Sequence, residues 1–143
     1  MTRRVLGIDV GERRIGLAIS DVSGTLARPL RALDVRDMTD GVGRVVAAID
    51  ALAREDEGLT AVVVGMPRRL DGTANEATVR VTRFVDMLRV RASVPVELED
   101  ERLSSREAEQ LLSLRERDWR KRKTKLDAAA AAVILQDHLD RQR

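Results

Sequence analysis

The chain has 143 residues, 43% hydrophobic and 35% charged, with a net charge of +2, which is typical of a single globular domain over residues 1–143. It contains no cysteine, so disulfides, thiolate zinc sites and cysteine nucleophiles are excluded. The N-terminus lacks a signal-peptide pattern and no apolar run is long enough to cross a membrane, so we expect a cytoplasmic protein.

The hydrophobic pattern predicts strands that alternate with helices after an initial set of three strands. The expected strands cover residues 4–10, 14–20, 26–33, 60–65 and 94–98, and the expected helices lie around 42–52, 73–88, 104–114 and 125–139. Pro29 has no N–H group to donate a hydrogen bond within a sheet, so the third strand is expected near an edge. These elements predict an α/β fold with a mixed five-stranded sheet, three strands antiparallel and then two parallel, flanked by helices.

Two helix starts are predicted from capping-box spacing. Thr73 and Glu76 have this spacing before the second helix, and Ser104 and Glu107 have it before the third.

One carboxylate, Asp9, lies inside the otherwise apolar first strand, where an unpaired charge is costly. Strand alternation places Asp9 on the same face as Gly7, and small residues such as Gly16 line the matching face of the second strand. These small residues leave room for a close neighbour, and the alanine run at 128–132 in the closing helix is a candidate.

Two other segments are expected to bring carboxylates to the same edge of the sheet. Asp127 stands directly before the alanine run, and the fifth strand leads into the acidic residues 99–101. A cluster of carboxylates is suited to Mg²⁺ or Mn²⁺, which prefer oxygen ligands. Zinc is disfavoured, because the chain has no cysteine and only one histidine, His138.

Four stretches of the chain resemble the successive motifs of the YqgF/RuvX family. They are "GIDVGERRIGLAISD", "VVGMPRRLDGT", "EDERLSSREAE" and "KTKLDAAAAAVILQDHL", in the same order and with similar gaps. The resemblance implies an RNase H-like fold related to RuvC resolvases, and a cytoplasmic nuclease that acts either on the 5′ end of pre-16S rRNA or on Holliday junctions. It implies metal-binding, catalytic roles for Asp9, Asp100 or Glu101, and Asp127.

The chemistry expected of such acids is hydrolysis of phosphodiester bonds with two divalent ions about 3.5–4 Å apart. Pre-rRNA is the first expected substrate and a four-way DNA junction the alternative. A nucleic-acid binding module without activity is a third hypothesis. Monomer and homodimer both remain open, since only a symmetric junction favours a dimer.

Each acid also has a purely structural interpretation. Asp9 could cap the turn that follows it, and the acids at 99–101 could form a solvated strand end. Asp127 could be the third residue of a helix that starts at Thr124. His138 is expected to be an exposed residue near the end of the closing helix.

The run from Arg115 to Lys125 carries seven basic residues against two acidic ones. It could be a solvated face or a loop, but it directly precedes Asp127 and could hold phosphates at the rim of the site. Trp119 could stack on a base or pack the loop down. Arg14 and Arg102 could contact nucleic acid or pair with acids. The full set of expected nucleic-acid contacts is Arg14, Arg68, Arg69, Arg102, Trp119, Arg120, Lys121, Arg122, Lys123 and Lys125.

Overall fold

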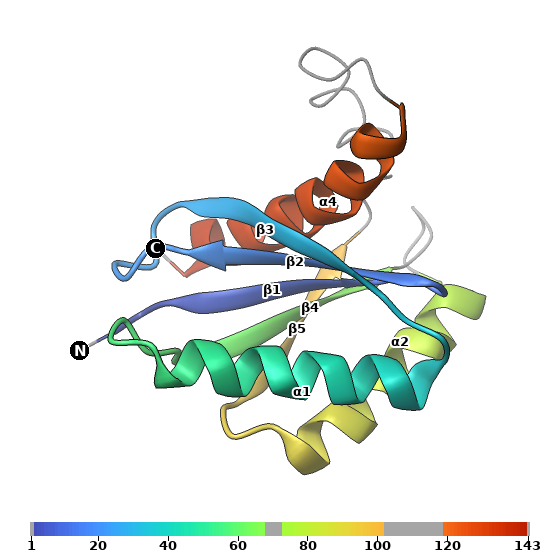
Figure 1. The fold of residues 1–143 in the computed structure, drawn as a ribbon, viewed down its shortest axis with the longest axis horizontal. Coiled ribbons are helices and arrows are strands. Elements are labelled where there is room, and N and C mark those ends of the chain that lie inside the picture. Colours follow the sequence, from blue (N-terminus) through green and yellow to red (C-terminus); the bar gives the residue numbers. More distant parts are fainter. Residues whose placement is uncertain (1, 68–72, 102–118, 143) are drawn as a thin grey trace.

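The computed structural model describes residues 2–67, 73–101 and 119–142, with the backbone alone for 119–125. In chain order, the elements are β1 (Val5–Val10), β2 (Arg14–Ser20), β3 (Ala27–Asp34), α1 (Met38–Arg54), β4 (Ala61–Pro67), α2 (Glu76–Arg91), β5 (Val96–Glu101) and α4 (Trp119–Arg141). Figure 1 shows their arrangement around one sheet.

The sheet has five strands in the order β3-β2-β1-β4-β5. Strands β1, β2 and β3 pair antiparallel, whereas β4 runs parallel to β1 and β5 runs parallel to β4. The predicted mixed sheet is therefore confirmed. Pro29 lies in β3, at an edge of the sheet, as its missing N–H group requires.

Helices cover both faces of the sheet, with α1 and α2 on one side and α4 on the other (Figure 1). Leu6 and Ile8 of β1 pack into the core beneath α1 and α2. Val5 packs on the opposite face against Leu135 and Leu139 of α4. The alternation predicted for the first strand is confirmed.

Glycines allow α4 to lie very close to the sheet. A Cβ atom at Gly7 would lie 2.7 Å from Cβ of Leu135, and one at Gly65 would lie 2.5 Å from Cδ1 of Ile134. Because real Cβ atoms do not approach other atoms so closely, larger residues at these positions would push the helix away. The prediction that small residues make room for the closing helix is confirmed.

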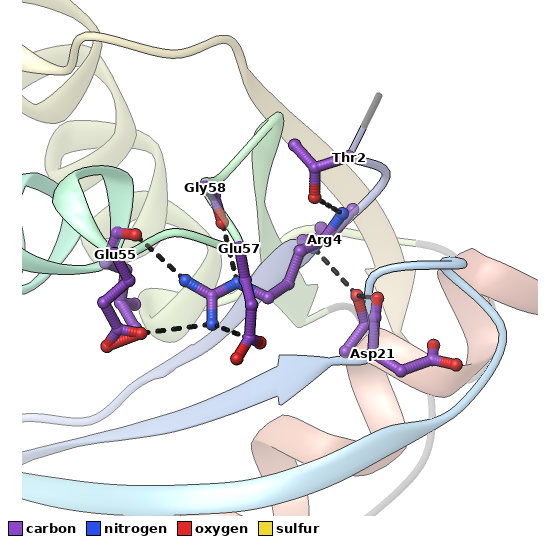
Figure 2. Close-up of polar contacts among 9 residues, drawn as sticks. Thr2, Arg4, Asp21, Glu55, Glu57 and Gly58 are labelled. Carbon is purple, nitrogen blue, oxygen red and sulfur yellow. Dashed lines mark hydrogen bonds and ion pairs between the residues drawn. The ribbon is translucent and has the colours of Figure 1, made fainter.

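Arg4, at the N-terminal side of β1, joins the sheet to the end of α1 (Figure 2). The residue is only 3% exposed. Its guanidinium donates to the carbonyl oxygens of Leu52 and Gly58, at 2.9 and 2.7 Å, and to the carboxylates of Glu55 and Glu57. The cation thus satisfies a carbonyl of the last turn of α1 and complements the helix dipole.

Three predicted boundaries differ from the structure. The N-cap of α2 is Asn75, which forms a reciprocal box with Thr78, so the predicted box of Thr73 and Glu76 is wrong. The Thr78 hydroxyl also donates to the carbonyl of Pro67 at 2.6 Å, and this tertiary contact favours the later start.

The fifth strand covers residues 96–101 rather than 94–98, so the acidic residues lie within the strand and not beyond it. The closing helix begins at Trp119, not near residue 125. The predicted helix at 104–114, with its box of Ser104 and Glu107, lies outside the described residues. No described helix combines the length and apolar character needed to cross a membrane.

Candidate active site

Asp9 is the next-to-last residue of β1, on the face that α4 covers. Its neighbour across the antiparallel pair is Gly16 of β2. The following turn is closed by the N–H group of Gly11, which donates to the carbonyl of Arg14 at 2.9 Å. Among the described residues, the Asp9 carboxylate accepts no hydrogen bond, so it does not cap this turn.

The environment of Asp9 disfavours the ionised form of its carboxyl group. The pKa of Asp9 is raised from 3.8 to about 6, mostly by burial and also by the charge of Asp127, while the positive charge of Arg80 lowers it. A buried carboxylate next to a second carboxylate is a typical environment for a cation, which would stabilise both charges.

Asp127 reaches this position because α4 crosses β2 directly over Gly16. A Cβ atom at Gly16 would overlap the carbonyl oxygen of Asp127. Since Gly16 pairs with Asp9, the same contact brings Asp127 next to Asp9. The helix begins at Trp119, so Asp127 lies in its interior and the helix-start interpretation of Thr124–Asp127 is wrong.

Arg14, the first residue of β2, forms an ion pair with this second acid. Its Nε atom lies 2.9 Å from Oδ2 of Asp127, and both side chains are partly buried. The acid-pairing alternative for Arg14 is confirmed. The pair orients the Asp127 carboxylate and offsets part of its charge.

The acids of β5 divide between the two faces of the sheet. Glu99 forms ion pairs with His138 and Arg141 of α4, so it lies on the α4 face. Because side chains alternate along a strand, Glu101 shares that face and Asp100 faces the opposite side. Asp100 is exposed, whereas Glu101 is partly buried and has one covered carboxylate oxygen.

Asp9 and Asp127 therefore form a pair, and Glu101 is a third carboxylate on the same face of the sheet, but the three do not form a closed cluster. Within residues 2–67, 73–101 and 119–142, no three His, Asp or Glu side chains are close enough together to hold a metal ion. The donor chemistry nevertheless fits Mg²⁺ or Mn²⁺, because Asp9, Asp127 and Glu101 offer only carboxylate oxygens.

The sequence profile of the RuvX family, described as Holliday junction resolvase, matches residues 3–141. This chain belongs to the RuvX family. Relatives named as candidate pre-16S rRNA nucleases cover almost its full length. The protein of Chloroflexus aggregans is 42% identical, over 97% of this chain and 94% of its own length. The protein of Geobacillus kaustophilus is 39% identical, over 98% of this chain and 99% of its own length.

Two solved structures share the fold of this RuvX-family chain. The RuvC structure from Thermus thermophilus has a TM-score of 0.53 and 21% identity, covering 97% of this chain and 95% of RuvC. The same protein in complex with a Holliday junction substrate has a TM-score of 0.52 and 24% identity, covering 97% and 94%. These similarities confirm the RuvC-like, RNase H-like fold predicted from the motifs.

Several residues of this RuvX-family chain that were predicted to contact nucleic acid lie outside the described residues or are described by their backbone alone. Arg68, Arg69 and Arg102 lie outside the described residues. The residues from Trp119 to Lys125 form the first turns of α4, so this part of the basic run is helical rather than a loop. The roles predicted for their side chains remain predictions.

His138 was expected to be exposed, and this is wrong. The residue is 7% exposed, with Nε2 at 3.3 Å from Glu97 and Nδ1 at 3.5 Å from Glu99. The expectation failed because α4 packs on β5 up to its last turn, which the polar sequence around His138 does not indicate.

Arg80 of α2 was not among the predicted site residues, although its positive charge lowers the pKa of Asp9. Arg80 forms an ion pair with Glu12, in the turn between β1 and β2, at 3.2 Å. The sequence contained a signal that could have identified Arg80. Arg80 lies one turn into a helix that follows the C-terminal end of a parallel strand, the usual location of sites in α/β sheets.

Proposed function

We propose that this chain is a metal-dependent nuclease that hydrolyses phosphodiester bonds, with the 5′ end of pre-16S rRNA as its substrate. The observation that carries the proposal is the burial of Asp9 beside Asp127, which together raise the pKa of Asp9, in a RuvX-family chain. A structural role alone does not account for it, because a buried acid beside a second carboxylate destabilises a fold, and among the described residues Arg14 pairs directly only with Asp127.

Asp9, Asp127 and Glu101 would hold Mg²⁺ or Mn²⁺ in this proposal. When bound, the ions supply an activated water and neutralise charge on the phosphate. Arg14 holds the Asp127 carboxylate in place through its ion pair. Glu101 is proposed in preference to Asp100 because it shares the face of Asp9.

Basic residues would bind the nucleic-acid backbone around these acids. The start of α4 carries Arg120, Lys121, Arg122 and Lys123, one to two turns before Asp127. Cations at this distance attract phosphates and so offset the repulsion between an acidic site and an anionic substrate. Arg68, Arg69, Arg102 and Lys125 are proposed as further phosphate contacts, and Trp119 as a base-stacking residue.

The choice of rRNA follows the names of relatives that are about 40% identical over nearly the whole chain. A four-way DNA junction is the alternative, favoured by the description of the family profile and by the RuvC fold. A dimer is required only by the junction alternative, because a two-fold substrate needs two symmetric cuts.

The test is a cleavage assay with Mg²⁺, Mn²⁺ or EDTA, on RNA that spans the 5′ end of pre-16S rRNA and on a synthetic four-way junction. We expect metal-dependent cleavage of the RNA, which Asp9→Asn abolishes. Asp86→Asn, on the exposed face of α2, is the matched control and should keep full activity.

Each outcome separates two hypotheses. Cleavage of the junction but not of the RNA would favour the resolvase. Binding without cleavage, in every metal, would favour a binding module. Undiminished cleavage by Asp9→Asn would contradict the proposed site.

A further inference from the structure

Arg80 has a buried donor with no partner at the edge of the proposed site. Its Nη1 atom donates to Oε1 of Glu12 at 3.2 Å, and this is the only hydrogen bond that the side chain makes among the described residues. The Nε atom is buried without a hydrogen bond. Buried donors are nearly always satisfied in folded proteins, so an unsatisfied one calls for an explanation such as a ligand.

The location of Arg80 is fixed by the start of α2. The Thr78 hydroxyl donates to the carbonyl of Pro67 at 2.6 Å, which holds the first turn of α2 at the C-terminal end of β4. Arg80 follows within the next turn, and its side chain reaches back to the turn after β1, where Glu12 lies. It therefore approaches Asp9 from the side opposite the helix that carries Asp127.

Arg80 is near Asp9 but does not bind it. Its charge lowers the pKa of Asp9, yet the two side chains form no ion pair within 4.0 Å among the described residues. An arginine that served only as the counter-ion of Asp9 would contact the carboxylate directly, as Arg14 contacts Asp127. A role as the counter-ion of Asp9 alone therefore does not explain the position of Arg80.

The pair with Glu12 does not account for the arginine either. The Glu12 side chain is 76% exposed, and ion pairs with exposed partners contribute little to stability. Glu12 engages a single nitrogen, which leaves the edge formed by Nε and Nη2. The two parallel N–H groups on that edge can donate to two oxygens of one phosphate. Arginine can form this bidentate pair, whereas lysine cannot.

We propose that Arg80 is a catalytic residue that binds the non-bridging oxygens of the scissile phosphate through its Nε–Nη2 edge. The inference rests on the proposed nuclease function and extends it to a residue outside the four sequence motifs. The phosphate lies between Arg80 and the acids, and the guanidinium stabilises the charge that builds up on the phosphate oxygens during hydrolysis. The Arg80 side chain is 29% exposed and, among the described residues, is held only by its contact with Glu12. The guanidinium can therefore turn its Nε–Nη2 edge toward the phosphate.

The experiment compares Arg80→Ala and Arg80→Lys with Arg83→Ala, an exposed arginine one turn further along the same helix. All variants are assayed for kcat and KM in Mg²⁺, and for oligonucleotide affinity in Ca²⁺. We expect Arg80→Ala to lower kcat roughly 100-fold, with a much smaller change in KM. Arg80→Lys should keep the charge but recover only part of kcat, and Arg83→Ala should change kcat less than about threefold.

Glu12→Gln distinguishes catalysis from structure. If Arg80 acts only through its pair with Glu12, then Glu12→Gln should reproduce the defect of Arg80→Ala, which would overturn the inference. Equal kcat values for Arg80→Ala and Arg83→Ala in an active enzyme would also overturn it.

If the wild type cleaves neither substrate, the affinities in Ca²⁺ still test whether Arg80 contacts phosphate. Weaker binding by Arg80→Ala than by Arg83→Ala would keep the phosphate contact while refuting the nuclease. Equal binding would refute both.

Discussion

Asp9 combines two properties that conflict in the metal-free protein, since it is buried and it lies beside Asp127. Its pKa in the folded protein, about 6, exceeds the value of 3.8 that holds when the chain is unfolded. The folded state therefore binds the proton more tightly, and ionisation of Asp9 destabilises it at neutral pH. This destabilisation is fully present above pH 6 and disappears as the pH falls toward 3.8.

Asp9→Asn should consequently stabilise the metal-free protein at pH 7.5, by up to about 3 kcal/mol, because one pKa unit corresponds to about 1.4 kcal/mol. The gain should vanish near pH 4, where wild-type Asp9 is protonated. Urea denaturation at several pH values measures both effects. An equal gain at pH 7.5 and pH 4 would show that relief of charge is not the cause.

Strand alternation was sufficient to predict which way Asp9 faces and that glycines surround it. It could not reveal Arg80 or the burial of His138, because both depend on helices that reach the site from elsewhere in the sequence. Asp100 and Glu101 are adjacent and equally acidic, so only the register of β5 distinguishes their faces.

The helix α4 is the element that completes the site, and its distance from the sheet is set by glycine. Gly16→Ala would place a methyl group on the Asp127 carbonyl, so the helix must move away. We expect a loss of about 3 kcal/mol in the free energy of unfolding, together with a large loss of cleavage activity.

Gly43→Ala, inside α1, is the matched control for this change. The nearest atom to its new Cβ would be Nη1 of Arg91, at 3.9 Å, so the site is open. A helix-interior Gly→Ala change there should stabilise the protein by roughly 0.5–1 kcal/mol. Equal effects of the two substitutions would contradict the close approach of α4.

The basic residues at the start of α4 are predicted to bind the phosphates of nucleic acid. Replacement of Arg120, Lys121, Arg122 and Lys123 by glutamine should weaken binding to RNA and DNA alike. The slope of log affinity against log salt should decrease by about 0.7–0.9 for each phosphate that the protein no longer neutralises. An unchanged slope would mean that these side chains are solvated and bind no phosphate.

Sequence patterns predicted the strands and the order of the helices, but they placed helix starts poorly. The apolar stripe of α4 begins late, so its charged first turns resembled a loop. The start of α2 depends on the contact between Thr78 and Pro67, which local spacing does not encode.

At the scale of the whole molecule, one buried cation links the first strand to the end of α1. Arg4→Ala should lower the free energy of unfolding by roughly 2–4 kcal/mol, since two carbonyls and two carboxylates lose their donor. Arg3→Ala, its exposed neighbour, should change stability by less than about 0.5 kcal/mol in the same denaturation experiment. A similar loss in both variants would indicate that charge, and not the hydrogen bonds, is responsible.

The order of the acids along the chain has a consequence for protein synthesis. Asp9 and Glu101 belong to a sheet that is complete once β5 has been made, but Asp127 and the helix that covers the glycines are translated later. A nascent chain that has emerged only as far as β5 lacks one of the proposed metal ligands. The proposed nuclease would therefore stay inactive on the ribosome that makes it until α4 has emerged and docked, so cleavage of RNA near a translating ribosome is delayed until the fold is finished.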